Sequence, residues 1–257
     1  MRIKFLFFFL AIELFALGGN TRIESFNKSK KELANIYKEL KKKTIYCQAD
    51  FEGKHITNLN GFVSKNKTYR DNRVEWEHIV PAEKFGVNFD EWKNGNTECK
   101  DNKENDLGNR DCAQKTNIEF RRMQSDMHNL FPSIGTVNIL RLNYNFVDTL
   151  TNGDTFGKCK IRISSVTKEV EPPEYVKGTI GRTYLYMEKE YPTKMKLTFE
   201  EKIRFKKWNE LYPPNNQECK RAELIKNIQG NENIFVEKAC TNNSSSIKSK
   251  ILNFIKH

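Results

Sequence analysis

The sequence predicts an α+β fold that is mixed and rich in helices. Segments with apolar residues at spacings of three and four recur along the chain, and they alternate with short stretches that are typical of strands. Six cysteines, an even number, are spread over the chain, as in exported proteins stabilised by disulfides. At 257 residues the chain is long enough for one sizeable globular domain, with room for a small subdomain.

The first half of the chain is predicted to contain two helical regions and several short strands. Ser29, with a glutamate three residues later, resembles a capping box and predicts a helix over residues 30–43. From Ala113 the apolar residues again follow a helical spacing, until the Phe131-Pro132 step ends the helix. The remaining elements are extended segments at 54–58, 61–64 and 73–80, the last ending before Pro81, and a polar surface loop at 93–111.

The second half is predicted to be mainly helical. A proline pair at 172–173 starts one helix, Thr198 caps another, and Gly230 ends the last. Alternation of apolar and polar residues after Cys159 predicts a strand. The expected elements are a short helix at 133–140, an extended segment at 143–146, a strand at 159–166 and helices at 175–191, 198–211 and 216–228.

The two ends of the chain differ from its middle. A positive start, an apolar run to Leu17 and small residues after it predict a secretory signal peptide over residues 1–19. The run is short for a bilayer and is interrupted by Glu13, so an uncleaved anchor is the lesser alternative. A single domain is expected over residues 20–240, with no membrane span, followed by a polar tail over residues 241–257.

The cysteines predict three disulfides, although six cysteines allow 15 pairings. Cys99–Cys112 would close a short polar loop, and Cys219–Cys240 would hold the C-terminal region. Cys47–Cys159 would then join the early and middle parts of the chain. These pairings are a hypothesis. No C-x-x-C pair occurs, which argues against a zinc knuckle or a thioredoxin-like site.

The chain is strongly basic. Its 44 Lys and Arg residues outnumber 33 Asp and Glu residues, which gives a formal charge of +11. Such a surface favours polyanions, of which nucleic acid is the commonest. A solvated basic face on a protein with another task explains the charge about as well, so charge alone does not decide the function.

Glu77, His78 and Asn129 are the side chains that predict chemistry. Glu77 and His78 lie at the end of a predicted strand, and Asn129 lies off the apolar stripe at the end of a predicted helix. Carboxylate and amide oxygens suit Mg²⁺, and a neighbouring histidine that does not bind the metal can accept a proton from water. Neighbouring residues of a regular strand point to opposite faces, so Glu77 and His78 share a site only where the strand ends or twists.

The other histidines are better explained by structure. The chain has four, His55, His78, His128 and His257, too few for a multi-histidine zinc site. His128 is a second candidate base, but a helix-end histidine that bonds carbonyl groups is the more common situation.

Four segments resemble the bacterial endonuclease I family of periplasmic and secreted nucleases. They lie in the family's order, and the resemblance extends over about residues 30–240. The segments are Val74-Glu75-Trp76-Glu77-His78-Ile79-Val80-Pro81-Ala82, Asp126-Met127-His128-Asn129-Leu130-Phe131-Pro132-Ser133-Ile134-Gly135-Thr136-Val137-Asn138, Arg141-Leu142-Asn143-Tyr144-Asn145-Phe146 and Gly178-Thr179-Ile180-Gly181-Arg182-Thr183-Tyr184-Leu185-Tyr186-Met187.

The resemblance implies a ββα-metal (His-Me finger) nuclease core. In that core His78 is the general base, and Glu77 and Asn129 hold Mg²⁺, or another divalent cation such as Mn²⁺ or Ca²⁺. The family also uses an arginine just before a cysteine to stabilise the cleaved phosphate. The matching stretch, Gly108-Asn109-Arg110-Asp111-Cys112, has its arginine displaced by one position, and Arg110 is the candidate.

The expected substrate is DNA, with RNA as a further substrate, cut without strong sequence preference. Binding would then depend on phosphate contacts, and the candidates are Arg73, Arg121, Arg122 and Arg141; Arg121 and Arg122 are also the fallbacks for Arg110. The protein is expected to be a monomer in the periplasm or the medium. The main alternative is an exported DNA-binding protein without catalysis. A disulfide-stabilised adhesin or toxin explains the charge but leaves the motifs to chance.

Overall fold

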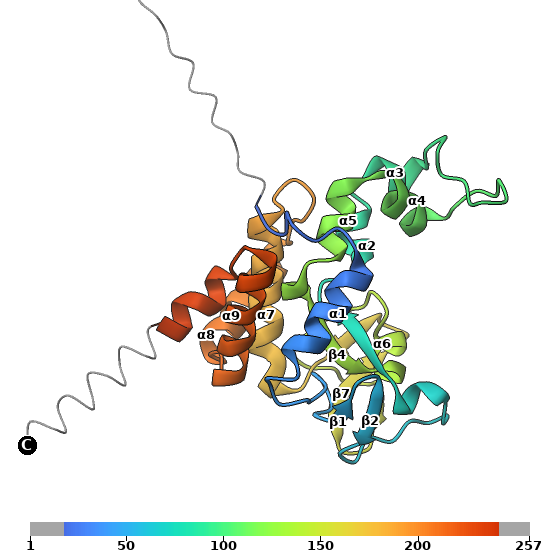
Figure 1. Cartoon of the computed structure of the whole chain (residues 1–257). Helices are drawn as coiled ribbons and strands as arrows, with labels where there is room; N and C mark the ends of the chain where they lie inside the picture. The colour runs from blue at the N-terminus through green and yellow to red at the C-terminus, as the bar shows by residue number, and fades with distance from the viewer. Residues whose placement is uncertain (1–17, 242–257) are drawn as a thin grey trace, which may run out of the picture.

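The structure is a computed structural model that describes residues 18–241 (Figure 1). Most of the predicted signal peptide, residues 1–17, and the predicted tail from residue 242 lie outside the described residues. The helix-rich α+β class is confirmed: long helices form one side of the molecule, and short strands gather on the other (Figure 1). No described helix has the length and apolar character that crossing a membrane requires.

Three helices make up the helical side, namely α7 (Glu174–Glu190), α8 (Phe199–Leu211) and α9 (Asn216–Gln229). Helix α8 begins at the predicted capping residue Thr198, and α9 ends at Gly230, whose φ of 91° favours glycine. Helices α7 and α8 pack closely because α7 carries glycine at the contact. A Cβ atom at Gly181 would lie 2.6 Å from the carbonyl oxygen of Phe205.

The strands form three small sheets. β1 (Asp50–Glu52) and β2 (His55–Asn58) are an antiparallel pair. The largest sheet has four strands in the order β5 (Asn145–Phe146), β8 (Glu169–Glu171), β7 (Cys159–Ser164) and β6 (Asp154–Phe156). In it β5 and β8 are parallel, and the other neighbours are antiparallel, so the sheet is mixed.

The third sheet carries the sequence motif. β3 (Val74–His78) pairs antiparallel with β4 (Leu130–Ile134), and His78 lies opposite Leu130. Helix α6 (Gly135–Arg141) follows β4 directly. β4 contains Pro132, which a two-stranded pair tolerates because each strand has a free edge. The carbonyl oxygen of Pro132 uses that edge and accepts a hydrogen bond from the Ile45 amide at 2.8 Å.

The remaining helices surround this sheet. Helix α1 (Phe26–Ile36) lies beside it in Figure 1, and the short 3₁₀ helix η1 (Tyr69–Asn72) precedes β3. Helices α3 (Asp90–Asn94) and α4 (Asn109–Thr116) and the loop between them form a projection, called here the arm, residues 90–116. The other elements are α2 (Ala82–Gly86), α5 (Ile118–Gln124), η2 (Met127–Asn129) and the helical residues 234–241.

Several elements differ from the predictions. The first helix ends at Ile36 and not at residue 43, and strands β1, β6 and β8 were not predicted. The first helix begins at Phe26, because Ser25 rather than Ser29 caps it and Ser29 is buried. The helix expected from Ala113 is broken at Asn117, which ends α4 and caps α5 through its side chain. β4 was not predicted, because a buried apolar segment with a proline resembles a helix end in sequence.

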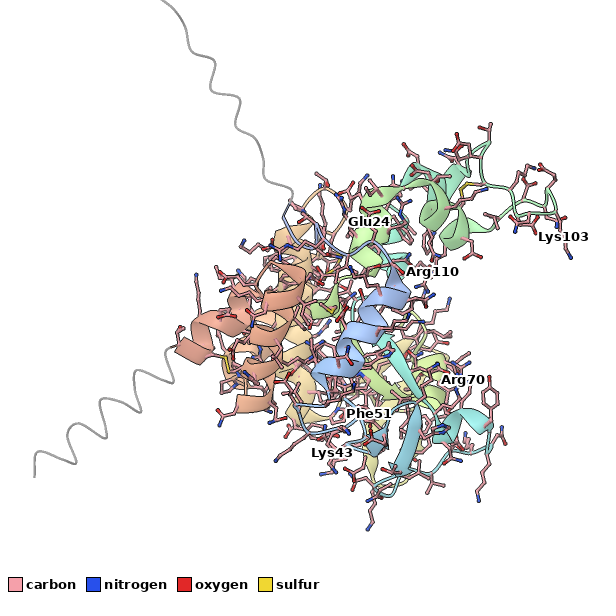
Figure 2. All side chains as sticks on the ribbon, viewed as in Figure 1. Glu24, Lys43, Phe51, Arg70, Lys103 and Arg110 are labelled. Carbon is pink, nitrogen blue, oxygen red and sulfur yellow. A yellow bond between two sulfur atoms is a disulfide. The ribbon has the colours of Figure 1, made fainter. Side chains whose placement is uncertain are left out.

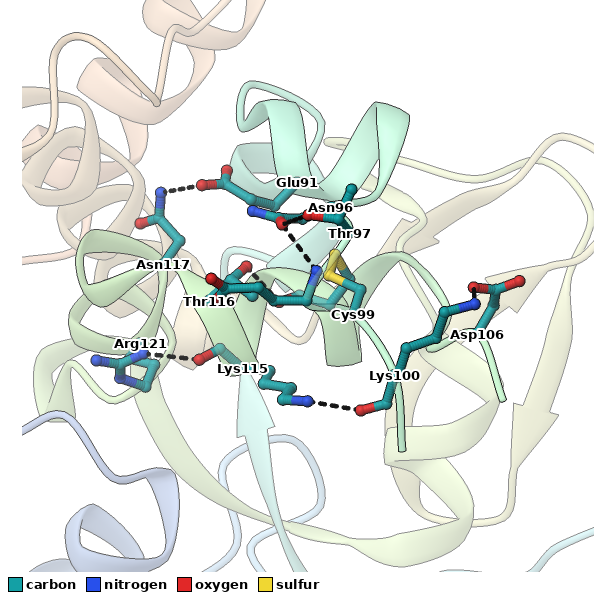
Figure 3. The surroundings of a disulfide bond; sticks show 12 residues. Glu91, Asn96, Thr97, Cys99, Lys100, Asp106, Lys115, Thr116, Asn117 and Arg121 are labelled. Atoms are coloured by element: carbon teal, nitrogen blue, oxygen red, sulfur yellow. Dashed lines mark hydrogen bonds and ion pairs between the residues drawn. A yellow bond between two sulfur atoms is a disulfide. The ribbon is translucent and has the colours of Figure 1, made fainter. Parts of the chain in front are cut away.

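All three predicted disulfides are confirmed: Cys47–Cys159, Cys99–Cys112 and Cys219–Cys240. Cys99–Cys112 joins the loop of the arm to α4 (Figure 3). Beside it, the Lys115 ammonium donates to the carbonyl oxygen of Lys100 at 2.6 Å, and Arg121 donates to the carbonyl oxygen of Lys115 at 3.2 Å (Figure 3). The base of the arm is therefore fixed by a covalent bond and by hydrogen bonds.

Candidate active site

A groove of about 1040 Å³ contains the end of β3. Its lining comes from α1, the turn between β1 and β2, β3, α2, α6 and the base of the arm. Glu77 and His78 both line it, although they are neighbours in a strand. The sequence analysis required the strand to end or twist at this pair. β3 does end at His78.

Glu77 is buried at the floor of the groove, with 2% of its surface exposed. Its Oε1 accepts a hydrogen bond from the Tyr46 hydroxyl at 2.8 Å and lies 3.4 Å from Arg141 Nη1. Burial raises the pKa of Glu77 to about 7, while Arg141 and the Tyr46 hydrogen bond act in the opposite direction. No protein hydrogen bond to Oε2 occurs among the described residues, which leaves that oxygen for a ligand.

His78 is held in one orientation. Its Nε2 lies 2.8 Å from the carbonyl oxygen of Gln124, and a carbonyl can only accept, so Nε2 carries the proton. The ring of Phe26 packs on it, with the centroids 5.0 Å apart. Burial first, and then the positive charge of Arg110, lower the pKa of His78 to about 3. The imidazole is therefore neutral at physiological pH, with the lone pair on Nδ1.

Asn138, which the sequence reasoning missed, lines the same groove. It lies on α6, and its Nδ2 donates to Glu75 Oε2 at 2.8 Å. This bond fixes the orientation of the amide, and its oxygen accepts no hydrogen bond from any residue of the range 18–241. A signal in the sequence could have found this residue. Asn138 and Arg141 are three residues apart in α6, the helix that follows β4, and therefore lie on the same face of that helix.

Asn129 has a different place from the one expected of a metal ligand. Its side chain is fully buried and does not line the groove. Its Nδ2 donates to the carbonyl oxygen of Val80 at 2.9 Å, and its Oδ1 accepts from the Val80 amide at 2.7 Å. Both ends of the amide are thus used to hold the backbone that leaves β3. The structure therefore does not bring Asn129 and Glu77 together in the groove.

Arg110 lines the groove from the first turn of α4, at the base of the arm (Figure 2). Its only hydrogen bonds among the described residues are long ones, 3.3 and 3.4 Å, to the side-chain oxygen of Gln124. The fallback residues are occupied elsewhere: Arg121 and Arg122 both pair with Glu24, at 3.4 and 3.2 Å. Of the three arginines, Arg110 alone is placed to meet a ligand in the groove.

The two other arginines expected to contact nucleic acid have different roles. Arg73 is exposed and lines the groove. Arg141 also lines it but is only 1% exposed. Its guanidinium donates to the carbonyl oxygens of His78, at 3.0 Å, and Ile79, at 2.8 Å. Arg141 therefore supports the end of β3 from α6 rather than presenting its charge to solvent.

His128 does not belong to the groove. It is buried, its Nε2 lies 3.3 Å from the carbonyl oxygen of Asn231, and its ring contacts Tyr186. Burial lowers the pKa of His128. These contacts agree with the expectation that His128 bonds a carbonyl group and is not the base.

The comparisons with known proteins agree with the motif series. The family model for endonuclease I matches residues 20–240. The chain belongs to the endonuclease I family. It is 34% identical to an extracellular deoxyribonuclease of Aeromonas hydrophila over 90% of this chain and 96% of the relative. It is also 34% identical to a periplasmic deoxyribonuclease of the same species, over 84% and 87% of the two chains, and to Endonuclease-1 of Buchnera aphidicola, over 92% and 90%.

The groove of this endonuclease I family member offers a donor set that fits a hard divalent cation. Within residues 18–241, neither Glu77 Oε2 nor the Asn138 side-chain oxygen accepts a hydrogen bond from the protein. Mg²⁺ keeps several waters and binds few protein ligands, so two oxygens are sufficient. The described residues contain no group of three or more His, Cys, Asp and Glu side chains that could hold a metal ion.

Proposed function

We propose that the protein is an exported, Mg²⁺-dependent deoxyribonuclease that hydrolyses phosphodiester bonds with little sequence preference. The observation that carries the proposal is the groove that Glu77, His78, Asn138 and Arg110 line together. Membership of the endonuclease I family and the extracellular and periplasmic deoxyribonucleases among its relatives support DNA as substrate and an exported location. Three disulfides agree with an oxidising compartment.

Glu77 and Asn138 are the residues that would hold the cation, with Asn138 in place of the expected Asn129. We infer that β3, β4 and α6 form the ββα-metal unit of the fold. A bound Mg²⁺ supplies positive charge that stabilises the developing charge on the phosphate. Tyr46 and Arg141 hold Oε1 of Glu77, so that its other oxygen stays directed to the ligand.

His78 acts as the general base in this proposal. Because Gln124 holds the Nε2 proton, Nδ1 is the nitrogen that accepts a proton from the attacking water. The water oxygen forms a bond to phosphorus, and the bond from phosphorus to the leaving oxygen breaks. The lowered pKa of His78 keeps the imidazole unprotonated before the reaction, as a base requires. Arg110 lies where a guanidinium can bond the cleaved phosphate with two parallel hydrogen bonds.

A plasmid assay tests the proposal. Wild-type protein with Mg²⁺ is expected to convert supercoiled plasmid to nicked and linear forms, and a chelator is expected to stop it. Glu77→Gln keeps the side-chain size but removes the carboxylate, and the variant is expected to be inactive at the same metal concentration. Arg162→Gln, on β7 and outside the groove, is the control. A wild-type protein that binds plasmid but never cuts it would favour the non-catalytic DNA-binding alternative.

A further inference from the structure

Part of the groove lining is positively charged and has no acidic partner. Lys30 and Lys31 on α1, Lys54 in the turn between β1 and β2, and Arg73 before β3 all line it. None of the four forms an ion pair with any residue in the described range 18–241. The rest of the lining is different in character: Glu83 on α2 is acidic, and it accepts a hydrogen bond from Asn143 at 2.6 Å.

Lys30, Lys54 and Arg110 line the same groove, although all three are cations. Burial lowers the pKa of Lys30, and the charges of Lys54 and Arg110 lower it further. The carboxylates of the lining do not offset these charges by direct pairing, since Glu75 pairs with Arg70 and Glu77 with Arg141. Like charges brought together in this way destabilise the free protein, and a bound anion relieves the repulsion. Other lysines of the fold do pair with carboxylates, for example Lys84 with Glu201 and Lys43 with Asp50.

The position of Lys30 relative to His78 indicates which anion it would meet. Phe26 contacts the His78 ring, and the Lys30 ammonium lies over the same Phe26 ring, 4.6 Å from its centroid. One aromatic ring of α1 thus contacts both groups, which places the Lys30 ammonium on the α1 side of the imidazole.

The turn that carries Lys54 is fixed to the same region. The carbonyl oxygen of Lys54 accepts a hydrogen bond from the Val74 amide at 3.0 Å, and His55 forms a β-bridge with Arg73. The turn is thus attached to the start of β3, the strand that ends in Glu77 and His78. Two elements far apart in sequence present one lysine each along the side of the groove that leads away from the reacting groups.

We propose that Lys30 and Lys54 form a second phosphate subsite, which binds the backbone phosphate next to the one that is cleaved. The inference rests on the proposed function and adds a requirement to it: the substrate is a polynucleotide that continues toward α1 and the β1–β2 turn. These residues hold the strand in place and take no part in the proton transfer. Lys30 and Lys54 are accordingly binding residues, and their loss affects KM and not the chemical step.

Steady-state and single-turnover cleavage of a long DNA at several KCl concentrations tests this subsite. The variants are Lys30→Met, which keeps the alkyl chain on Phe26, Lys54→Met, and Lys28→Met as the control, an exposed lysine of α1 outside the groove. Each subsite variant is expected to raise KM several-fold and to leave the single-turnover rate at saturating DNA unchanged. The slope of log kcat/KM against log salt should become shallower by about 0.7–0.9, the value for one lost phosphate contact. Lys30→Arg should restore both quantities.

Slopes equal to that of Lys28→Met would overturn the subsite, and so would a loss confined to the single-turnover rate, which would place the lysines at the cleaved phosphate. Binding of the same DNA in a chelator separates this outcome from failure of the proposed function. If wild-type protein never cleaves, the enzyme proposal fails, while the difference in binding between Lys30→Met and Lys28→Met still decides whether the lysines contact the strand.

Discussion

At the scale of single residues, the proposed chemistry depends on two side chains whose pKa values are shifted in opposite directions. Burial raises the pKa of Glu77 to about 7 and lowers that of His78 to about 3. Over the whole physiological range His78 is a neutral base, whereas Glu77 is only partly ionised near neutral pH. Any pH dependence between 5 and 8 at this site is therefore assigned to Glu77.

Mg²⁺ affinity is expected to rise with pH and to level off above about 7. Without metal, the raised pKa of Glu77 contributes stability that is fully present below its ordinary value of about 4.5 and is lost as pH rises through about 7. Metal binding needs the ionised carboxylate, so below pH 7 the affinity should fall about tenfold per pH unit. Calorimetric titration of the DNA-free protein at pH 5.5, 6.5 and 7.5 measures this. A pH-independent affinity would contradict the ligand role of Glu77.

Asn138 and Asn129 are expected to respond differently to replacement by alanine. Asn138→Ala should weaken Mg²⁺ binding and cleavage with little change in melting temperature, because the residue is half-buried and bonds only Glu75. Asn129→Ala leaves the amide and carbonyl of Val80 buried without partners, which should lower the free energy of unfolding by about 2–4 kcal/mol. Melting curves with and without Mg²⁺ compare the two. The reverse pattern would return the ligand role to Asn129.

At the scale of elements, the site depends on how α6 supports the end of β3. Arg141 closes α6 and donates to the carbonyl oxygens of His78 and Ile79, while its charge lies beside Glu77. The guanidinium therefore fixes the backbone of His78 and of the residue after it, and it lowers the pKa of Glu77. Its ring contact with Phe146, at 4.5 Å, anchors it from β5.

Arg141→Met is expected to be harmful in two separable ways. Breaking a buried ion pair typically costs about 3–5 kcal/mol, so the melting temperature should fall. The pKa of Glu77 should rise further, and the pH at which Mg²⁺ affinity levels off should move above 7. A purely structural role predicts the first effect without the second. Arg141→Lys keeps a positive charge at this position, so it should preserve part of the stability and part of the lowering of the Glu77 pKa.

Residues that cap or end helices predicted many elements from the sequence alone. The positions of the site residues depend instead on contacts between segments that are far apart in the chain. Thr198 caps the start of α8 with its own side chain, and Gly230 ends α9 through its left-handed backbone conformation. Both of these helix ends agree with the prediction. The ligand role of Asn129 rested on its position off a helical stripe. Where its amide points depends on Val80, 49 residues away, and on the unpredicted strand β4 between Asn129 and α6. No periodicity in a single sequence reports that pairing.

At the scale of the whole molecule, three disulfides join segments that are separated along the chain. Cys47–Cys159 spans 112 residues and joins the segment after α1 to the four-stranded sheet. Cys47 follows Tyr46, whose hydroxyl bonds Glu77. Cys99–Cys112 spans 13 residues and fixes the arm, whose base carries Arg110. The predicted pairings followed from loop closure in the sequence, because the short pairs are close along the chain.

Removing the long disulfide is expected to cost more stability than removing the short one. Loop-closure entropy predicts about 3 kcal/mol for a loop near 15 residues and about 4.7 kcal/mol for one near 100. Double Cys→Ser variants of Cys47–Cys159 and Cys99–Cys112 should therefore differ in this order in guanidinium unfolding. Equal losses, or a larger loss for the arm, would show that strain or residual structure outweighs loop length.

The single-turnover rate of His78→Ala at saturating DNA and Mg²⁺ tests the central claim most directly. General-base catalysis contributes about 10²–10⁴-fold, so the rate should fall by at least two orders of magnitude while the dissociation constant for DNA in a chelator stays unchanged. Added imidazole should restore part of the lost rate. A variant that cleaves within a few-fold of the wild-type rate would contradict the assignment of the base to His78.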